Sequence, residues 1–148
     1  MDLSKIVQPG LTHEASFMVG EKDLATHVGS GAASVLATPV MIAFMEKISH
    51  ALLAKHLPEG YSSVGTLVNV RHLAPTPLGA TVHVRADVLD LDGLKVILSV
   101  QAWDEIDEVT EKIGEGLHER FVINEARFLK RVEEKKLKIT RGEDHTEP

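Results

Sequence analysis

Glu46 and His72 are the candidates for acid–base chemistry in this sequence, and Thr38 is a third residue that a site could use. Glu46 stands in an otherwise apolar stretch, where a carboxylate loses hydration and becomes suited to act as a general acid or base. His72 is suited to act as a base or to position a water molecule. From Thr38 to Glu46 a helix rises by about 12 Å, so the two side chains do not touch along one helix. A site that uses both needs a substrate that reaches between them, or a second copy of the chain.

Each of these residues also has a structural interpretation. Glu46 is equally compatible with an ordinary exposed glutamate, or with a partner of Lys47 or His50 on the same helix. A buried neutral histidine that hydrogen-bonds a neighbour is the common fate of a residue such as His72. The hydroxyl of Thr38 can cap the start of a helix, which would explain this residue without any chemistry.

Other sites of known chemistry are missing from the sequence. The chain has eight histidines and no cysteine, and its histidines show no compact metal-ligand spacing: His50 and His56, for example, are six apart and cannot share one helical face. No G-x-S-x-G elbow, P-loop or G-x-G-x-x-G stretch is present. We therefore expect no metal and no cofactor.

The elements that must position the three residues follow from periodicity. Thr38-Pro39 is a helix-start signal, and the helix is expected to run to about His56. Alternating apolar residues and turn signals predict strands at 11–19, 62–73, 81–88, 96–102 and 109–123. The turn between the third and fourth strands is Asp92-Gly93, and an acidic loop is expected from Asp104 to Glu108.

Period-two alternation assigns faces to the residues of the 62–73 strand. It places Val64, Thr66, Val68, Val70 and His72 on one side, and Gly65 with its alternating neighbours on the other. His72 should therefore point toward the core.

Two glycines and an asparagine mark features of the last strand. Gly114 and Gly116 indicate a bulge or a close approach of another part of the chain. Asn124 should cap a final basic helix.

The order of elements, one long helix followed by strands, predicts the α+β class, with the helix wrapped by an antiparallel sheet. At 148 residues the chain has room for one domain, which we assign to residues 1–141, with a disordered tail at 142–148. The helix is apolar on more than one side, so part of its surface should be covered by a partner subunit. We expect a homodimer or a dimer of dimers.

The net charge of −6 argues against nonspecific nucleic-acid binding. We expect no membrane partner either, because there is no long apolar segment and no signal peptide, and we expect a cytoplasmic protein. Only the C-terminal end is basic, at Arg127, Lys130, Arg131, Lys135, Lys136, Lys138 and Arg141. That end is either a solvated helix face or part of a cradle for an anionic ligand such as a nucleotide phosphate.

Three segments, 37–46, 64–79 and 116–120, resemble the fluoroacetyl-coenzyme A thioesterase family. They contain the T-x7-E spacing, the S-x-G-T to H-x-A-x-T-P block and the G-x-H-E-R strand. The resemblance covers residues 10–130 and implies a hotdog fold with acyl-thioester sites at a dimer interface. It assigns Thr38, Glu46 and His72 as catalytic residues. Gly65 and Arg120 match the family's substrate-contacting glycine and arginine.

The resemblance implies hydrolysis of an acyl-CoA, with Glu46 attacking the carbonyl or deprotonating water. One position departs from the family: Ala32 replaces the aromatic gate found six residues before the threonine in the fluoroacetate-selective member. Short or medium acyl-CoAs are therefore the expected substrates. Two other functions remain as alternatives, a non-catalytic acyl-CoA binding module and another hotdog activity such as enoyl-CoA hydration. The D-x4-N-x-x-H signature of hydratases is absent from this sequence, which makes enoyl-CoA hydration the weaker alternative.

Overall fold

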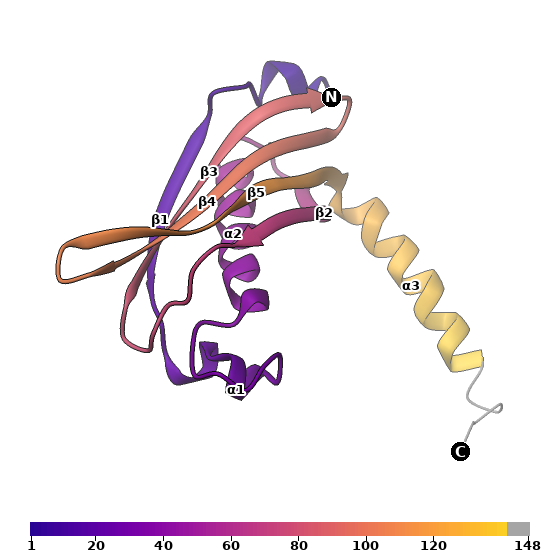
Figure 1. Ribbon diagram of the computed structural model, residues 1–148. Coiled ribbons are helices and arrows are strands. Elements are labelled where there is room, and N and C mark those ends of the chain that lie inside the picture. Colours follow the sequence, from indigo (N-terminus) through magenta and orange to yellow (C-terminus); the bar gives the residue numbers. More distant parts are fainter. Residues whose placement is uncertain (142–148) are drawn as a thin grey trace.

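The structure, a computed structural model, describes residues 1–141. Its longest apolar helix is α2 (Thr38–Ala54), which ends two residues earlier than predicted. Met41, Met45, Ile48 and Leu52 recur at helical spacing and are buried. Figure 1 shows α2 lying along one face of the sheet.

The sheet has five antiparallel strands in the order β1-β3-β4-β5-β2. The strands are β1 (Thr12–Met18), β2 (Tyr61–His72), β3 (Thr81–Asp92), β4 (Lys95–Ile106) and β5 (Val109–Asn124). Alternate residues in 82–88 of β3 and 96–104 of β4, such as Val84 and Leu98, are buried on the side of the sheet that faces α2. The α+β class is confirmed, and β2, which carries His72, is an edge strand.

Three short helical elements precede α2. They are η1 (Leu3–Lys5), η2 (Glu21–Asp23) and α1 (Ala25–Val28), and two isolated β-bridges, Leu24 to Leu36 and Val35 to Pro77, fasten the segment that leads into α2. The final helix, α3 (Glu125–Arg141), begins as predicted, because the Asn124 side chain accepts a hydrogen bond from the Arg127 amide at 3.1 Å. The predicted tail at 142–148 lies outside the described residues.

The predicted acidic loop is shorter than expected. Asp104 and Glu105 belong to β4, and only Asp107 and Glu108 form the turn, with positive φ angles of 51° and 65°. Asp104 is buried and accepts a hydrogen bond from the Thr76 hydroxyl at 2.9 Å. The charge run indicated a loop because a buried, paired aspartate in a strand has the same sequence appearance as an exposed one.

Gly114 and Gly116 are places of close approach, as predicted. A methyl group at Gly114 would meet the Met41 sulfur of α2 at 2.5 Å, and one at Gly116 would collide with the Asn69 backbone. The register between β4 and β5 also shifts beside Gly114. Small residues therefore let β5 lie tight against both α2 and β2.

Helices α1, α2 and α3 are the α-helices of the described residues. Within residues 1–141, none is both long and apolar enough to cross a bilayer.

Candidate active site

The predicted faces of β2 are wrong in one half of the strand. The register between β2 and β5 shifts between Gly65 and Leu67, so Thr66 is an extra, bulged residue. Gly65 pairs with Arg120, and His72 pairs with Gly114. The bulge puts Gly65 and His72 on the same face of the sheet, the one that faces α2.

Thr38 and His72 form one half of the candidate site. Thr38 was predicted to cap α2, but the cap is Ala37 and no side chain bonds the free amides there. The Thr38 hydroxyl instead lies 2.7 Å from Nδ1 of His72. Burial lowers the pKa of His72, so the ring is neutral at neutral pH.

The other ring nitrogen of His72, Nε2, is buried and has no hydrogen-bond partner among the described residues. An unpaired buried nitrogen is unusual, since most such atoms are satisfied. Its hydrogen-bonding capacity is therefore not used by the described residues. A hollow of about 340 Å³ lies here, bounded by Thr38 and His72 and by mostly small or apolar residues that include Ala25, Leu36 and Ala74. This lining suits a short hydrocarbon chain.

Glu46, Gly65 and Arg120 form the other half. Nη1 of Arg120 lies 4.0 Å from Oε2 of Glu46, with the arginine side chain 7% exposed and the glutamate 44% exposed. A methyl group at Gly65 would lie 2.8 Å from the same carboxylate oxygen. Glycine thus leaves the space in which the carboxylate sits over the strand.

Two residues that the sequence reasoning did not single out, Ser63 and His118, hold Arg120 in place. Its Nε donates to the Ser63 hydroxyl at 2.8 Å and its Nη2 donates to the Ser63 carbonyl at 2.9 Å. Nη1 donates to Nε2 of His118 at 3.2 Å, and Nδ1 of His118 donates to the Leu67 carbonyl at 2.8 Å. Since a guanidinium only donates, this fixes the tautomer of His118.

The signal for His118 was present in the sequence, because it lies two residues before Arg120 and so shares its strand face. Ser63 gave a weaker signal. Its spacing from Gly65 places both on one face, but only the structure shows that its carbonyl and hydroxyl point to a guanidinium. Burial lowers the pKa of both His118 and Arg120.

Within one protomer these residues form two separate groups. The Thr38–His72 pair lies at the start of α2, and the Glu46–Gly65–Arg120 group lies two turns further along, a rise of about 12 Å. One protomer therefore assembles each half of the predicted set and does not bring the halves into contact.

The neutral His118 predicts a pH-dependent stability. In the unfolded chain a histidine binds a proton near pH 6.5, whereas the folded-state pKa of His118 is lower, so the unfolded state binds more protons as the pH falls through this range. The free energy of unfolding should therefore decrease from pH 7.5 to pH 5.5, measured as a lower urea midpoint.

The matched variant is His118→Gln, whose amide can donate to Leu67 and accept from Arg120 without titrating. It should show a smaller decrease over the same pH range. An equal decrease in the variant would assign the pH dependence to other groups.

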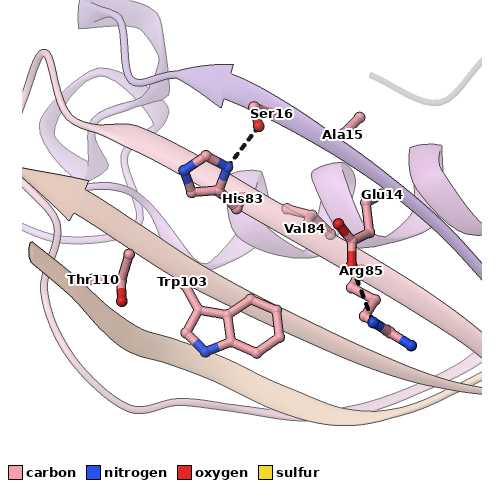
Figure 2. A pocket seen from close by; sticks show the side chains of 8 residues that line it. All are labelled: Glu14, Ala15, Ser16, His83, Val84, Arg85, Trp103 and Thr110. Atoms are coloured by element: carbon pink, nitrogen blue, oxygen red, sulfur yellow. Dashed lines mark hydrogen bonds and ion pairs between the residues drawn. The ribbon is translucent and has the colours of Figure 1, made fainter. Parts of the chain in front are cut away.

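A second hollow, of about 500 Å³, lies on the face of the sheet away from α2 (Figure 2). His83, which lines it, is bonded on both ring nitrogens: Ser16 Oγ lies 2.7 Å from Nδ1, and Nε2 lies 2.9 Å from Oε1 of the neighbouring Glu105. Figure 2 shows Arg85 turned toward Glu14, to which it donates at 3.1 Å. These are paired strand neighbours, and the hollow contains none of the predicted site residues.

Both the sequence and the fold are similar to those of proteins whose activity is described. Residues 19–126 match the family described as fluoroacetyl-CoA-specific thioesterase. The fluoroacetyl-CoA thioesterase of Streptantibioticus cattleyicolor is 39% identical over 101 residues, which cover 68% of this chain and 70% of the relative.

Solved structures of similar proteins share the fold of this chain. A fluoroacetyl-CoA thioesterase structure superposes with a TM-score of 0.79 at 30% identity, covering 87% of this chain and 97% of the other. A hot-dog-like protein of Thermanaerovibrio acidaminovorans superposes with a TM-score of 0.81 at 29% identity, covering 91% and 97%. The hotdog fold is thereby confirmed.

Proposed function

Because the chain belongs to the fluoroacetyl-CoA-specific thioesterase family, it is an acyl-CoA thioesterase, and we propose that Glu46, His72 and Thr38 carry out the hydrolysis. In the overall reaction, the oxygen of water becomes bonded to the thioester carbonyl carbon, the C–S bond breaks, and the CoA thiolate takes up a proton. The products are a free acid and CoA. In this proposal residues 1–141 act as a single hotdog domain.

Glu46 is the group that starts the reaction, either by attacking the carbonyl or by taking a proton from the attacking water. Two observations support this role. Its carboxylate is the acidic group that the buried guanidinium of Arg120 faces, and it remains accessible to a ligand in the single protomer. Arg120, itself fixed by Ser63, can orient the carboxylate or contact the substrate.

In this proposal His72 transfers a proton to the leaving thiolate. Its neutral ring has one nitrogen fixed by the Thr38 hydroxyl and one free nitrogen. When Nδ1–H donates to the Thr38 hydroxyl, Nε2 carries the lone pair, so it can take the proton that water loses and then give it to the departing thiolate. Gly65, which has no side chain, lets its backbone N–H approach the thioester oxygen.

The active form in this proposal is a homodimer joined through β2. This strand lies at the edge of the sheet, with unpaired backbone groups along one side and with Leu67 and Val68 44% and 39% exposed. A two-fold axis at the middle of this exposed stretch would pair the two β2 edges antiparallel. One sheet would then continue across both subunits.

Such pairing also completes the site. Around an axis at Val68, with the bulged Thr66 left out of the count, His72 of one copy faces Ser63 of the other, and Ser63 is the residue that holds Arg120. The Thr38–His72 half of one copy would then stand beside the Glu46–Arg120 half of its partner. The observation that carries this proposal is the separation of the two halves within one protomer.

Release of thiol from acyl-CoAs tests the function and its acyl range. Because Ala32 leaves no aromatic gate near the hollow at Thr38 and His72, we expect acetyl-, butyryl- and hexanoyl-CoA to be hydrolysed at comparable kcat/KM. Fluoroacetyl-CoA should exceed acetyl-CoA only by its greater intrinsic reactivity. An added methylene is worth about 10- to 200-fold where a pocket discriminates.

The matched variant is Ala32→Phe, which restores an aromatic side chain at this position and should disfavour the longer chains. Strong selectivity for the fluorinated substrate in the unchanged protein would show that position 32 does not set it. Absence of hydrolysis with all four thioesters, together with binding of CoA, would favour the non-catalytic binding module. We further propose that the enzyme acts in the cytoplasm.

A further inference from the structure

A third hollow, of about 290 Å³, lies where β5 ends and α3 begins. Its walls combine two kinds of side chain. Phe121, Phe128 and Leu94 are apolar and about two-fifths exposed, and Arg127 and Arg131 stand beside them. Exposed aromatic rings next to free cations are typical of sites that bind a planar base together with phosphates.

The two arginines are placed to act together. They are four residues apart in α3 and so project from the same side of the helix. Among the described residues, neither takes part in an ion pair within 4.0 Å. The whole chain carries a net charge of −6, so these cations form an isolated basic surface on an acidic protein.

The position of the hollow relates it to the candidate active site. Figure 1 shows α3 leaving the sheet at the end of β5, beside the start of β2. The Glu125 amide donates to the Gly60 carbonyl at 2.9 Å, which fastens the start of α3 to the residue before β2. Arg120 and Phe121 are neighbours in β5, with Arg120 facing Glu46 and Phe121 on the opposite face.

The distance between the two places suits one extended ligand. Four strand residues, a rise of about 13 Å, separate Arg120 from Asn124 at the start of α3. Because Phe121 lies on the face of the sheet opposite Glu46, the route from the hollow to Glu46 runs around the end of the sheet, past the start of β2. The pantetheine arm of CoA is a flexible chain that can follow such a route.

We propose that this hollow binds the adenosine 3′-phosphate 5′-diphosphate end of the CoA substrate. Phe121 and Phe128 contact the adenine ring, while Arg127 and Arg131 bind the phosphates. This inference rests on the proposed function, because it names where the non-reacting end of the same substrate is held. It also provides an anionic ligand for the basic surface of α3, although the net charge of the whole chain is negative.

The test compares acetyl-CoA with acetyl-pantetheine, which has the same reacting group and lacks the nucleotide. In Arg127→Ala/Arg131→Ala, KM for acetyl-CoA should rise at least about tenfold with kcat nearly unchanged, the scale expected for lost charged hydrogen bonds at a partly screened site. Hydrolysis of acetyl-pantetheine should not change. The control is Lys130→Ala/Lys136→Ala, which removes equal charge from α3 at residues that do not line the hollow.

Calorimetric binding of adenosine 3′,5′-bisphosphate provides a second measurement that does not depend on catalysis. Binding to the wild-type protein that is lost in the arginine variant and kept in the lysine control supports the inference. Equal losses in both variants, or unchanged KM in the arginine variant, would overturn it and leave the thioesterase function standing. If the wild type hydrolyses neither thioester, the proposed function fails, and bisphosphate binding alone decides whether the hollow is a nucleotide site.

Discussion

Replacing Glu46 with glutamine should lower kcat for acyl-CoA hydrolysis by at least about a hundredfold, the usual scale for losing a positioned base or nucleophile. The amide keeps the size of the side chain and its place beside Gly65. It removes the negative charge that faces Arg120 and the ability to take a proton or attack a carbonyl. Steady-state release of thiol from a substrate that the wild type hydrolyses measures the change.

Glu59→Gln is the matched control, since Glu59 is an exposed glutamate in the turn before β2 and lies in neither half of the site. It should keep wild-type turnover. Both variants should retain the far-UV circular dichroism of the wild type, because glutamine keeps the size of the side chain and Arg120 keeps its hydrogen bonds to Ser63. Near wild-type turnover in Glu46→Gln would make Glu46 an ordinary surface residue.

The second large effect is recovery of activity on mixing two inactive variants. His72→Ala alone should also lose at least about a hundredfold in kcat. If each site takes Glu46 from one copy and His72 from the other, a mixed dimer of Glu46→Gln and His72→Ala contains one intact site and one doubly defective site. Random exchange of equal amounts should therefore restore about a quarter of wild-type activity.

The mixing experiment distinguishes shared sites from sites within one subunit. In the second case every site of the mixed dimer contains one defect, and activity stays at the level of the separate variants. Light scattering on the wild type and on the mixture provides the control, since both must have the mass of a dimer or of a dimer of dimers. A stable monomer of 16.2 kDa would remove the basis of the shared site.

Much of the fold could be predicted because its signals are local. The alternation of Val82, Val84, Ala86 and Val88 defines a half-buried strand, and Asp92-Gly93 defines its turn. The apolar spacing within residues 38–54 defines α2 in the same way. In each case the residues that determine the element lie within a few positions of one another.

The parts that could not be predicted depend on contacts between distant segments. The Thr38 hydroxyl satisfies the local rule for a helix cap, yet it bonds His72, which is thirty-four residues further along the chain. Arg120 was recognised from a motif, but its supports, Ser63 and His118, became visible only when β2 and β5 were paired. Local periodicity also gives no sign of an extra residue in a strand.

The extra residue, Thr66, determines which face of the sheet each later residue of β2 occupies. Gly65 and His72 are seven positions apart, an odd number, so in a regular strand they would lie on opposite faces. The bulge makes the spacing effectively even, and both residues face α2. If Thr66 were instead paired in a regular strand, the chain would keep every chemical group of the site and present one half of it to the wrong side. With seven positions between Gly65 and His72, the bulge is therefore as necessary to this site as the identity of its groups, whereas a deletion of Thr66 that leaves a regular strand should keep both residues facing α2.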